Sequence, residues 1–233
     1  MKLTHRILGL SLAAAFAACS AGALAASGTV TQLSGTLSVM KADGSVRILS
    51  QKSAVENGDT LNTERDSYAQ IRFEDGGQVT LKPNTAVKID NVTFNEQKPQ
   101  ADSFFYSLLK GGLRAVTGVV GKRSKDKYQL GTATATIGIR GTTFSADDCA
   151  TSRGPDCPAV PAVYIGVADG EIVVRNAQGE IGLAAGQFGQ IAPNQRPLFL
   201  STDPGLQFTP PATFIQNVLG GTLGKGRLEC AVR

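Results

Sequence analysis

Apolar and polar residues alternate with a period of two along most of the chain after its first two dozen residues. The first such run covers residues 29–39, where Leu37 and Val39 share one side, and similar runs cover residues 67–73 and 78–81. Successive side chains of a β-strand point to opposite faces, so this period indicates strands with one buried face. Val, Ile and Thr recur in these runs, and β-strands favour all three.

Turn signals divide these runs at short intervals. Asp-Gly pairs at 43–44, 75–76 and 169–170, together with Gln178-Gly179, are each followed by an alternating or β-branched run. Asp-Gly is typical of tight hairpin turns, and closely spaced hairpins predict an all-β fold. The spacing is too irregular for a strict repeat. We therefore expect an antiparallel β-sandwich or β-roll, with a short β-solenoid as the alternative.

One apolar segment, residues 104–111, fits two structures. It could form a single helical turn capped by Asp102 and Ser103, or it could be a buried strand. The glycine pair at 111–112 would end any helix there, so we favour the strand.

The C-terminal part of the chain loses this strand pattern. Five prolines lie between residues 193 and 211 and break up regular structure. We expect an all-β domain over residues 26–200 and a largely irregular tail over residues 201–233. A brief helix at 214–219 is the one regular element that we expect in the tail.

The N-terminus has the three-part pattern of a secretory signal peptide. Lys2 and Arg6 precede an apolar run at 7–18, and the small residues of Ala23-Leu24-Ala25 then offer a cleavage site. The apolar run is too short for a membrane-spanning helix, which needs about 20 residues. We therefore expect residues 1–25 to be removed during export.

Cys19 offers a second interpretation of the same segment. Residues 16–20 are similar to a bacterial lipobox, in which the cysteine is lipidated and becomes the mature N-terminus. Such boxes usually carry Leu where Phe16 stands, and the downstream Ala-Leu-Ala site is better formed. We favour cleavage after Ala25. Cleavage after Ala25 would give a periplasmic or secreted protein, whereas lipidation at Cys19 would give an outer-membrane lipoprotein.

Composition excludes several classes of function. The one histidine, His5, lies in the signal peptide, so the exported chain has no His-based nucleophile pair and no His metal ligand. The formal charge of +4 loses two units with Lys2 and Arg6, which argues against nucleic-acid binding. No later apolar run reaches the length of a membrane span. We expect no cofactor, no metal and no enzymatic activity.

The cysteines fit an oxidising compartment. Cys149 and Cys157 flank a turn-rich segment that can bring their sulfur atoms together. We expect a disulfide between them, because two lone thiols without histidine make a poor metal site. Cys230 is left over, and it is either free or paired between molecules.

The most distinctive stretch lies between residues 128 and 144. It resembles the motif Thr-Pro-x-Ala-x-x-Gly-x-Arg-Gly-Thr-x-Phe of the FecR domain family, with Ala133 in place of the usual proline. The matching residues are Thr132, Ala135, Gly138, Arg140, Gly141, Thr142 and Phe144.

Other segments extend this resemblance over about residues 28–192. They include Gly58 to Thr63, Phe73 to Gly77, Leu81 to Thr85, Leu109 to Arg114, and Val167 to Val174 with Ala185 to Gln187. The resemblance implies an extracytoplasmic all-β domain. In its best-known members this domain follows a spanning helix and relays iron-uptake signals to a sigma factor. This sequence shows no cytoplasmic domain and no spanning helix, so the resemblance supports the fold more than the signalling role.

Two groups of charged residues are candidates for contact. Arg140 could bind an anionic ligand or satisfy carbonyl groups where the backbone bends, and we favour the structural role. The cations Lys122, Arg123, Lys125 and Lys127 could meet anionic lipid or a cell-wall polymer, or form a solvated loop.

Carboxylates raise one further possibility, glycoside hydrolysis. The pairs Glu74-Asp75, Asp147-Asp148 and Asp169 with Glu171 all lie at turn signals, where Asp is favoured for local hydrogen bonding. We regard a polysaccharide-active enzyme as a remote alternative. The leading hypothesis is an exported, non-catalytic module that binds a protein or an envelope polymer. The second is a soluble periplasmic sensor subunit in cell-surface signalling.

Overall fold

The structure is a computed structural model that describes residues 26–124, 126–151, 153–154, 157–206, 208, 210–212 and 214. The expected signal peptide, Cys19, Lys125, the brief helix at 214–219 and Cys230 lie outside the described residues, apart from Phe214. Predictions about them stay predictions.

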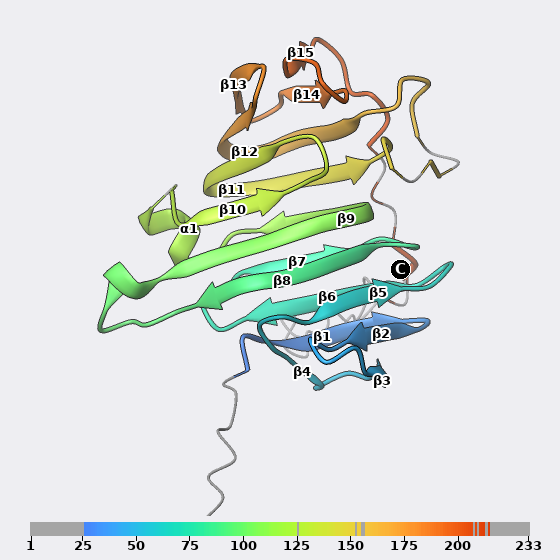
Figure 1. The fold of residues 1–233 in the computed structure, drawn as a ribbon, viewed down its shortest axis with the longest axis vertical. Coiled ribbons are helices and arrows are strands. Elements are labelled where there is room, and N and C mark those ends of the chain that lie inside the picture. The colour runs from blue at the N-terminus through green and yellow to red at the C-terminus, as the bar shows by residue number, and fades with distance from the viewer. Residues whose placement is uncertain are drawn as a thin grey trace, which may run out of the picture.

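The regular structure of the described chain is almost entirely β-strand (Figure 1). The first strands are β1 Gly28–Ser34, β2 Leu37–Met40, β3 Val46–Leu49, β4 Ala54–Val55, β5 Thr60–Thr63, β6 Tyr68–Phe73, β7 Gln78–Leu81 and β8 Ala86–Thr93. Next come the 3-10 turn η1 Pro99–Ala101, β9 Ser103–Val116, the short helix α1 Val119–Arg123, β10 Tyr128–Gly131, β11 Thr136–Asp148, β12 Val163–Asn176, β13 Gly179–Ala184, β14 Phe188–Ile191 and β15 Leu198–Leu200.

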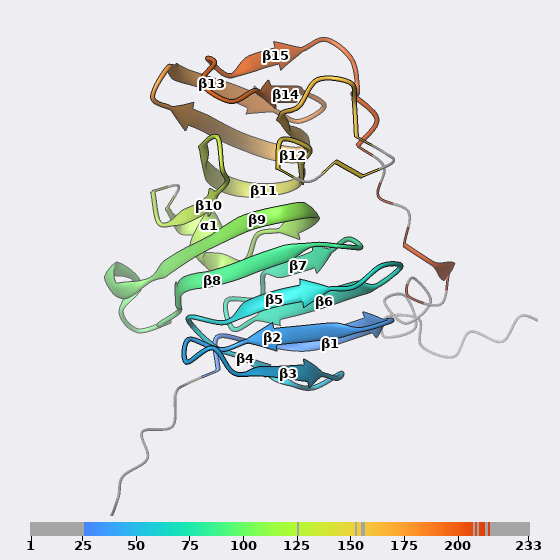
Figure 2. The ribbon, with the colours of Figure 1, turned by 45° about the vertical axis from the view of Figure 1, so that its right-hand side comes forward.

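The strands form one open, 15-stranded sheet that folds into two facing layers (Figures 1 and 2). Layer A runs β3-β2-β5-β8-β9-β10-β11-β12-β13, and layer B runs β4-β1-β6-β7-β9-β11-β12-β14-β15. Among the described strands only β9 and β10 pair in parallel. The all-β prediction is confirmed: the sheet is open and mixed, mainly antiparallel, and its two layers face each other as in a sandwich.

Three long strands belong to both layers, and each bends at a glycine. Gly111 in β9, Gly141 in β11 and Gly170 in β12 have φ angles of +79°, +57° and +80°. A residue with a Cβ adopts this left-handed region only at a cost, so glycine is the natural corner residue. In β11 the register also shifts between Arg140 and Thr143, as a β-bulge does.

This geometry corrects one turn prediction. The Asp-Gly pairs at 43–44 and 75–76 do connect hairpin strands, but Asp169-Gly170 lies inside β12. Gly170 turns the strand from layer B to layer A while its pairing with β11 continues on both sides. The positive φ that suits a hairpin turn suits a strand corner equally well.

The core lies between the layers and contains an aromatic cluster. Phe73 of layer B contacts Phe104 of layer A with ring centroids 4.7 Å apart. Phe104 also stacks on Tyr128 at 4.3 Å and meets Tyr106 edge-on. The segment around Phe104 is therefore a strand, as favoured from the sequence. Burial raises the pKa of both tyrosines, so their hydroxyls are neutral.

A buried carboxylate, Asp75, lies between the β6–β7 hairpin and α1. Asp75 accepts hydrogen bonds from the backbone N–H of Gly77 at 2.9 Å and of Val120, in α1, at 3.3 Å. Its backbone carbonyl also accepts from the N–H of Val119. Burial raises the pKa of the Asp75 carboxyl above its ordinary value. This residue ties α1 to the hairpin between β6 and β7.

The predicted disulfide is confirmed. Cys149 and Cys157 are bonded, with Cα atoms 5.6 Å apart, at the start of the connection between β11 and β12. Cys149 is buried against Ala162, Tyr164 and Ala192 on the outer side of layer B.

Replacing both Cys149 and Cys157 with serine is expected to lower the free energy of unfolding by about 2.5 kcal/mol, because the reduced chain regains the entropy of a nine-residue loop. Urea unfolding of the oxidised protein and of the double variant measures this difference. As a control, a reductant should destabilise the parent protein by the same amount and leave the variant unchanged. A difference below about 0.5 kcal/mol would contradict the expectation.

Candidate functional site

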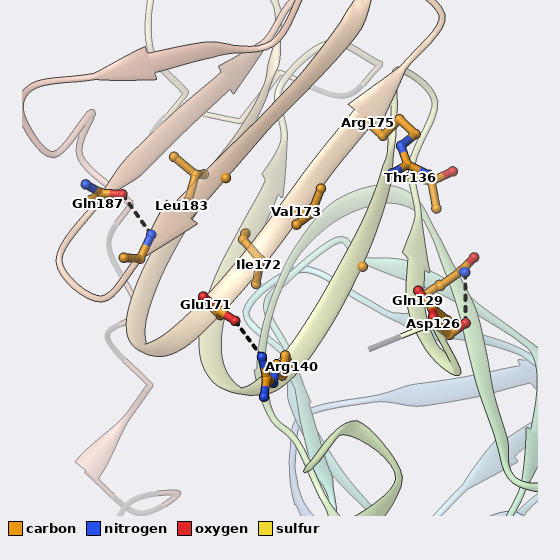
Figure 3. A pocket seen from close by; sticks show the side chains of 13 residues that line it. Asp126, Gln129, Thr136, Arg140, Glu171, Ile172, Val173, Arg175, Leu183 and Gln187 are labelled. Atoms are coloured by element: carbon orange, nitrogen blue, oxygen red, sulfur yellow. Dashed lines mark hydrogen bonds and ion pairs between the residues drawn. The ribbon is translucent and has the colours of Figure 1, made fainter. Parts of the chain in front are cut away.

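A groove of about 440 Å³ lies on the outer face of layer A, over strands β10 to β13 (Figure 3). Its floor is one row of paired residues that crosses four strands. Gln129 pairs with Gly138, Gly138 with Val173, and Val173 with Gly182. Gly138 and Gly182, on either side of Val173, have no side chains, so the side chains of the two neighbouring rows project above this one and form the walls.

One wall of the groove is the row of Arg140, Glu171 and Ala184, of which Arg140 belongs to the FecR-like motif. Arg140 lies opposite Glu171, and its guanidinium approaches that carboxylate to 3.3 Å. Glu171 pairs in turn with Ala184, whose N–H donates to the side-chain oxygen of Gln187 at 2.7 Å. Figure 3 shows this wall along the corner where β11 and β12 bend.

The opposite wall is the row of Thr136, Arg175 and Glu180. Arg175 pairs with both neighbours in register, and its Nε approaches the Glu180 carboxylate to 2.8 Å. The side chains of both ion pairs are more than half exposed, at 65% and 63% for Arg140 and Glu171. Exposed ion pairs contribute roughly 0–1 kcal/mol, so either can exchange its partner for a ligand at little cost.

The side chains of this site can form hydrogen bonds and ion pairs with a ligand. Both walls present guanidinium donors and carboxylate acceptors, and Asp126 and Gln129 close one end. The described residues contain no cluster of three or more His, Cys, Asp or Glu side chains able to hold a metal. Such a surface can bind an extended polar chain through the paired donors and acceptors of its walls.

The structure divides the motif residues between two places. Gly138 and Arg140 line the groove, whereas Phe144 is fully buried in the core. The Thr142 hydroxyl lies 2.9 Å from the carbonyl of Arg140 and 2.8 Å from that of Glu171, so it bridges the corner beside Gly141.

Thr132 acts locally in the turn before β11. Its hydroxyl donates to the Ala135 carbonyl at 3.0 Å and accepts from the Ala135 N–H at 3.1 Å. The motif therefore builds the turn, the corner and the core that hold Arg140 over the groove.

The basic cluster is largely engaged within the chain. Arg123 lies 3.4 Å from the buried Asp102 carboxylate and over the Phe94 ring. Lys127 donates to the carbonyl of Pro99 at 2.9 Å and to that of Gln100. Lys122 lies in α1 beside Gly141. Two of the three cations within the described chain thus hold the segment around η1.

The carboxylates of one pair considered from the sequence, Asp147-Asp148, have separate surroundings. Asp147 forms an ion pair with Lys82 at 2.7 Å, while Asp148 accepts from the backbone N–H of Ala150 and Thr151. Their side chains leave opposite faces of β11, as neighbours in a strand do. They therefore do not face each other across a cleft.

Most groove residues were not singled out from the sequence. Gln129, Val173, Arg175 and Gly182 come from three strands, β10, β12 and β13, and only the strand register brings them together. The one available signal was alternation outward from Gly138, which places Thr136 and Arg140 on the same face.

Within the described residues, no helix is long and apolar enough to cross a membrane.

Similar solved structures include two of a candidate anti-sigma factor from Parabacteroides distasonis ATCC 8503, at 13% and 15% identity and TM-scores of 0.46 and 0.47. Each match covers 62% of this chain and 60% of the other, so this chain spans about 60% of those proteins' length. A cell surface anchoring domain is 28% identical, with a TM-score of 0.27, over 28% of this chain and 84% of its own.

No curated protein matches the chain. A protein-family description, FecR protein, matches residues 59–156. The matched range begins at the hairpin before β5 and ends in the disulfide loop, and it includes the whole motif from Thr132 to Phe144. The motif residues thus lie in the stretch that the family description matches, and the resemblance to the FecR family is confirmed over residues 59–156.

Proposed function

We propose that this chain is an exported, non-catalytic FecR-like module that binds a partner protein or an envelope polymer in the groove over β10 to β13. The observation that carries the proposal is the glycine-floored row Gln129–Gly138–Val173–Gly182, which lies between two exposed Arg–Glu pairs. The export, the periplasmic or surface location and the domain limits of 26–200 are parts of this proposal.

The dimensions of the groove suit an extended chain. Strands lie about 4.8 Å apart, so a row across four strands spans about 14 Å. An extended polypeptide rises about 3.3 Å per residue, and the row therefore accommodates about four residues. Arginine on both walls can donate to carbonyl or carboxylate groups of such a ligand, while Glu171 and Glu180 accept from its N–H or O–H groups.

The groove is also fixed by its scaffold. Its walls stand on paired strands of a packed sandwich, and the Thr142 hydroxyl holds the corner that presents Arg140. A site on rigid strands binds without first losing the entropy of ordering itself.

A sensor subunit in cell-surface signalling is the second candidate. The FecR match favours it, because the best-known members of that family relay signals, and the groove would then receive a segment of a separate membrane protein. Deleting the gene and measuring envelope and iron-responsive transcripts separates the two functions. Unchanged transcripts would remove the signalling role and leave the binding role intact.

Filling the groove tests the proposal directly. Gly182 has ordinary extended backbone, and no atom lies within 4 Å of the place that an added Cβ would take, so Gly182→Leu adds bulk to the floor without strain. We expect this variant to lose at least about 90% of the partner captured from envelope extracts, because the leucine side chain occupies the space of the ligand.

Gly154→Leu is the matched control. Gly154 is equally open and also lacks a positive φ, but it lies in the disulfide loop, away from the groove. Its capture should equal that of the parent protein, and thermal unfolding should show both variants folded. Equal capture by the parent protein and both variants would show that the partner binds elsewhere.

A further inference from the structure

A segment near the C-terminus lies over the outer face of layer B. After β15 the chain turns at Asp203, whose carboxylate accepts from the N–H of Gly205 and Leu206 at 2.8 and 3.0 Å. It then descends beside the stack from β15 to the level of β6 (Figures 1 and 2). We call its described residues, 203–206, 208, 210–212 and 214, the strap.

The strap is anchored by a few apolar side chains. Leu206 packs against the cluster of Cys149 and Tyr164. Phe208 meets the Tyr68 ring edge-on at 6.4 Å. Phe214 lies 6.0 Å from the same ring and is only 4% exposed. Tyr68 in β6 is therefore the common aromatic contact of both phenylalanines.

Arg114 adds a charged contact to this surface. Its guanidinium lies over the Phe208 ring, 5.7 Å from the centroid. Such cation–π contacts contribute about 0.5–1 kcal/mol at exposed sites. The surface thus contacts the Phe208 ring with both a tyrosine ring and a guanidinium.

The strap does not extend the sheet. Among its described residues, the backbone makes no hydrogen bond with a strand, and the N–H of Phe214 bonds the Pro211 carbonyl within the strap itself. Pro210 and Pro211 have no N–H to give. Strands of a sheet are held by backbone hydrogen bonds to their neighbours. The strap is instead held by side-chain contacts, as many docked peptides are.

Open clefts flank the contact between strap and sheet. One, of about 240 Å³, lies between Phe208, Pro210 and Phe214 on one side and β6, β7 and β9 on the other. A second, of about 530 Å³, has Gly205 and Leu206 in its wall. The strap therefore leaves part of this face of layer B uncovered.

We propose that the outer face of layer B over β6, β7 and β9 is a docking surface for an extended, Phe- and Pro-containing segment of a partner protein, and that the strap is its resident occupant. Gln70, Gln78 and Thr80 line the same surface beside Tyr68 and Arg114. Proline-rich segments typically bind to surfaces that are lined with aromatic side chains and side-chain hydrogen-bond donors. This surface is on the other layer from the groove, so the inference is independent of the proposed function.

A synthetic peptide with the sequence of residues 203–214 tests the proposal by fluorescence anisotropy against the full chain. In the parent protein the strap competes with the peptide, because apparent affinity falls with the fraction of free surface. Phe208→Ala/Phe214→Ala in the chain removes the competitor, and we expect the peptide to bind this variant at least about tenfold more tightly. Adding Arg114→Ala and Tyr68→Ala should abolish the gain.

Two results would overturn the proposal. One is the absence of peptide binding to the folded double variant, and the other is equal affinity for that variant and the parent protein. A peptide in which both phenylalanines are alanine must fail to bind. Should the double variant not fold, Phe208→Ala alone keeps the buried Phe214 in place, and a gain of about threefold over the parent protein is then expected.

Discussion

Replacing Gly111 with alanine is expected to lower the free energy of unfolding by about 3–4 kcal/mol. Gly111 has φ of +79°, and a left-handed conformation costs a residue with a Cβ about 1–2 kcal/mol. The added Cβ would also lie 2.7 Å from the Thr85 Cα and 2.8 Å from the Asn84 carbonyl oxygen. These are backbone atoms, so relief requires the turn before β8 to move away from β9, and such overpacking costs roughly 1–3 kcal/mol.

Gly186 provides the matched control. Its φ is also +79°, but no atom lies within 4 Å of an added Cβ. Gly186→Ala should therefore carry only the conformational cost of about 1–2 kcal/mol. Urea unfolding of both variants separates strain from close approach. Equal losses at the two positions would show that the corner in β9 is not closely packed, against the two-layer account.

Replacing Phe104 with alanine is expected to cost about 3–5 kcal/mol, the usual range for a buried phenylalanine. Phe104 is fully buried and contacts Phe73, Tyr106 and Tyr128, which join the two layers. Its removal leaves a cavity bounded by rigid rings on paired strands, which cannot collapse easily.

The control for this prediction is Phe199→Ala in the edge strand β15. Phe199 is 54% exposed, so its loss should change the free energy of unfolding by about 0.5 kcal/mol or less. Thermal or urea unfolding checks both variants. A loss below about 1.5 kcal/mol for Phe104→Ala would contradict the placement of the aromatic cluster at the centre of the core.

Local signals in the sequence were sufficient for the local structure. The period of two located most strands, and the hairpins at Asp43-Gly44 and Asp75-Gly76 followed from turn chemistry. The bond between Cys149 and Cys157 followed from their short separation. Each of these features depends on residues that are close together along the chain.

Features that depend on distant pairing could not be predicted in this way. Asp169-Gly170 carries the same two letters as a hairpin turn, yet pairing with β11 on both sides makes it a corner within β12. That three long strands are shared between the layers depends on such corners. The positive φ was predictable from Gly170, but its use was not.

The groove shows the same limit. Arg140 and Gly138 attracted attention because of the motif, whereas Arg175 and Gly182 stand in strands whose register no local pattern fixes. For Arg140 the sequence favoured a structural role. The structure places its side chain on the surface beside Glu171, where its guanidinium is exposed and can contact a ligand.

The central claim is that the groove over β10 to β13 is the binding site, and site-specific photocrosslinking in cells tests it most directly. A photoreactive residue at Gln129, at the end of the groove, is compared with one at Gly154 in the disulfide loop. We predict a discrete crosslinked product from position 129 that is absent from position 154 and is lost when Arg140→Ala is added. The same products from both positions, or a product from position 129 that persists without Arg140, would contradict the claim.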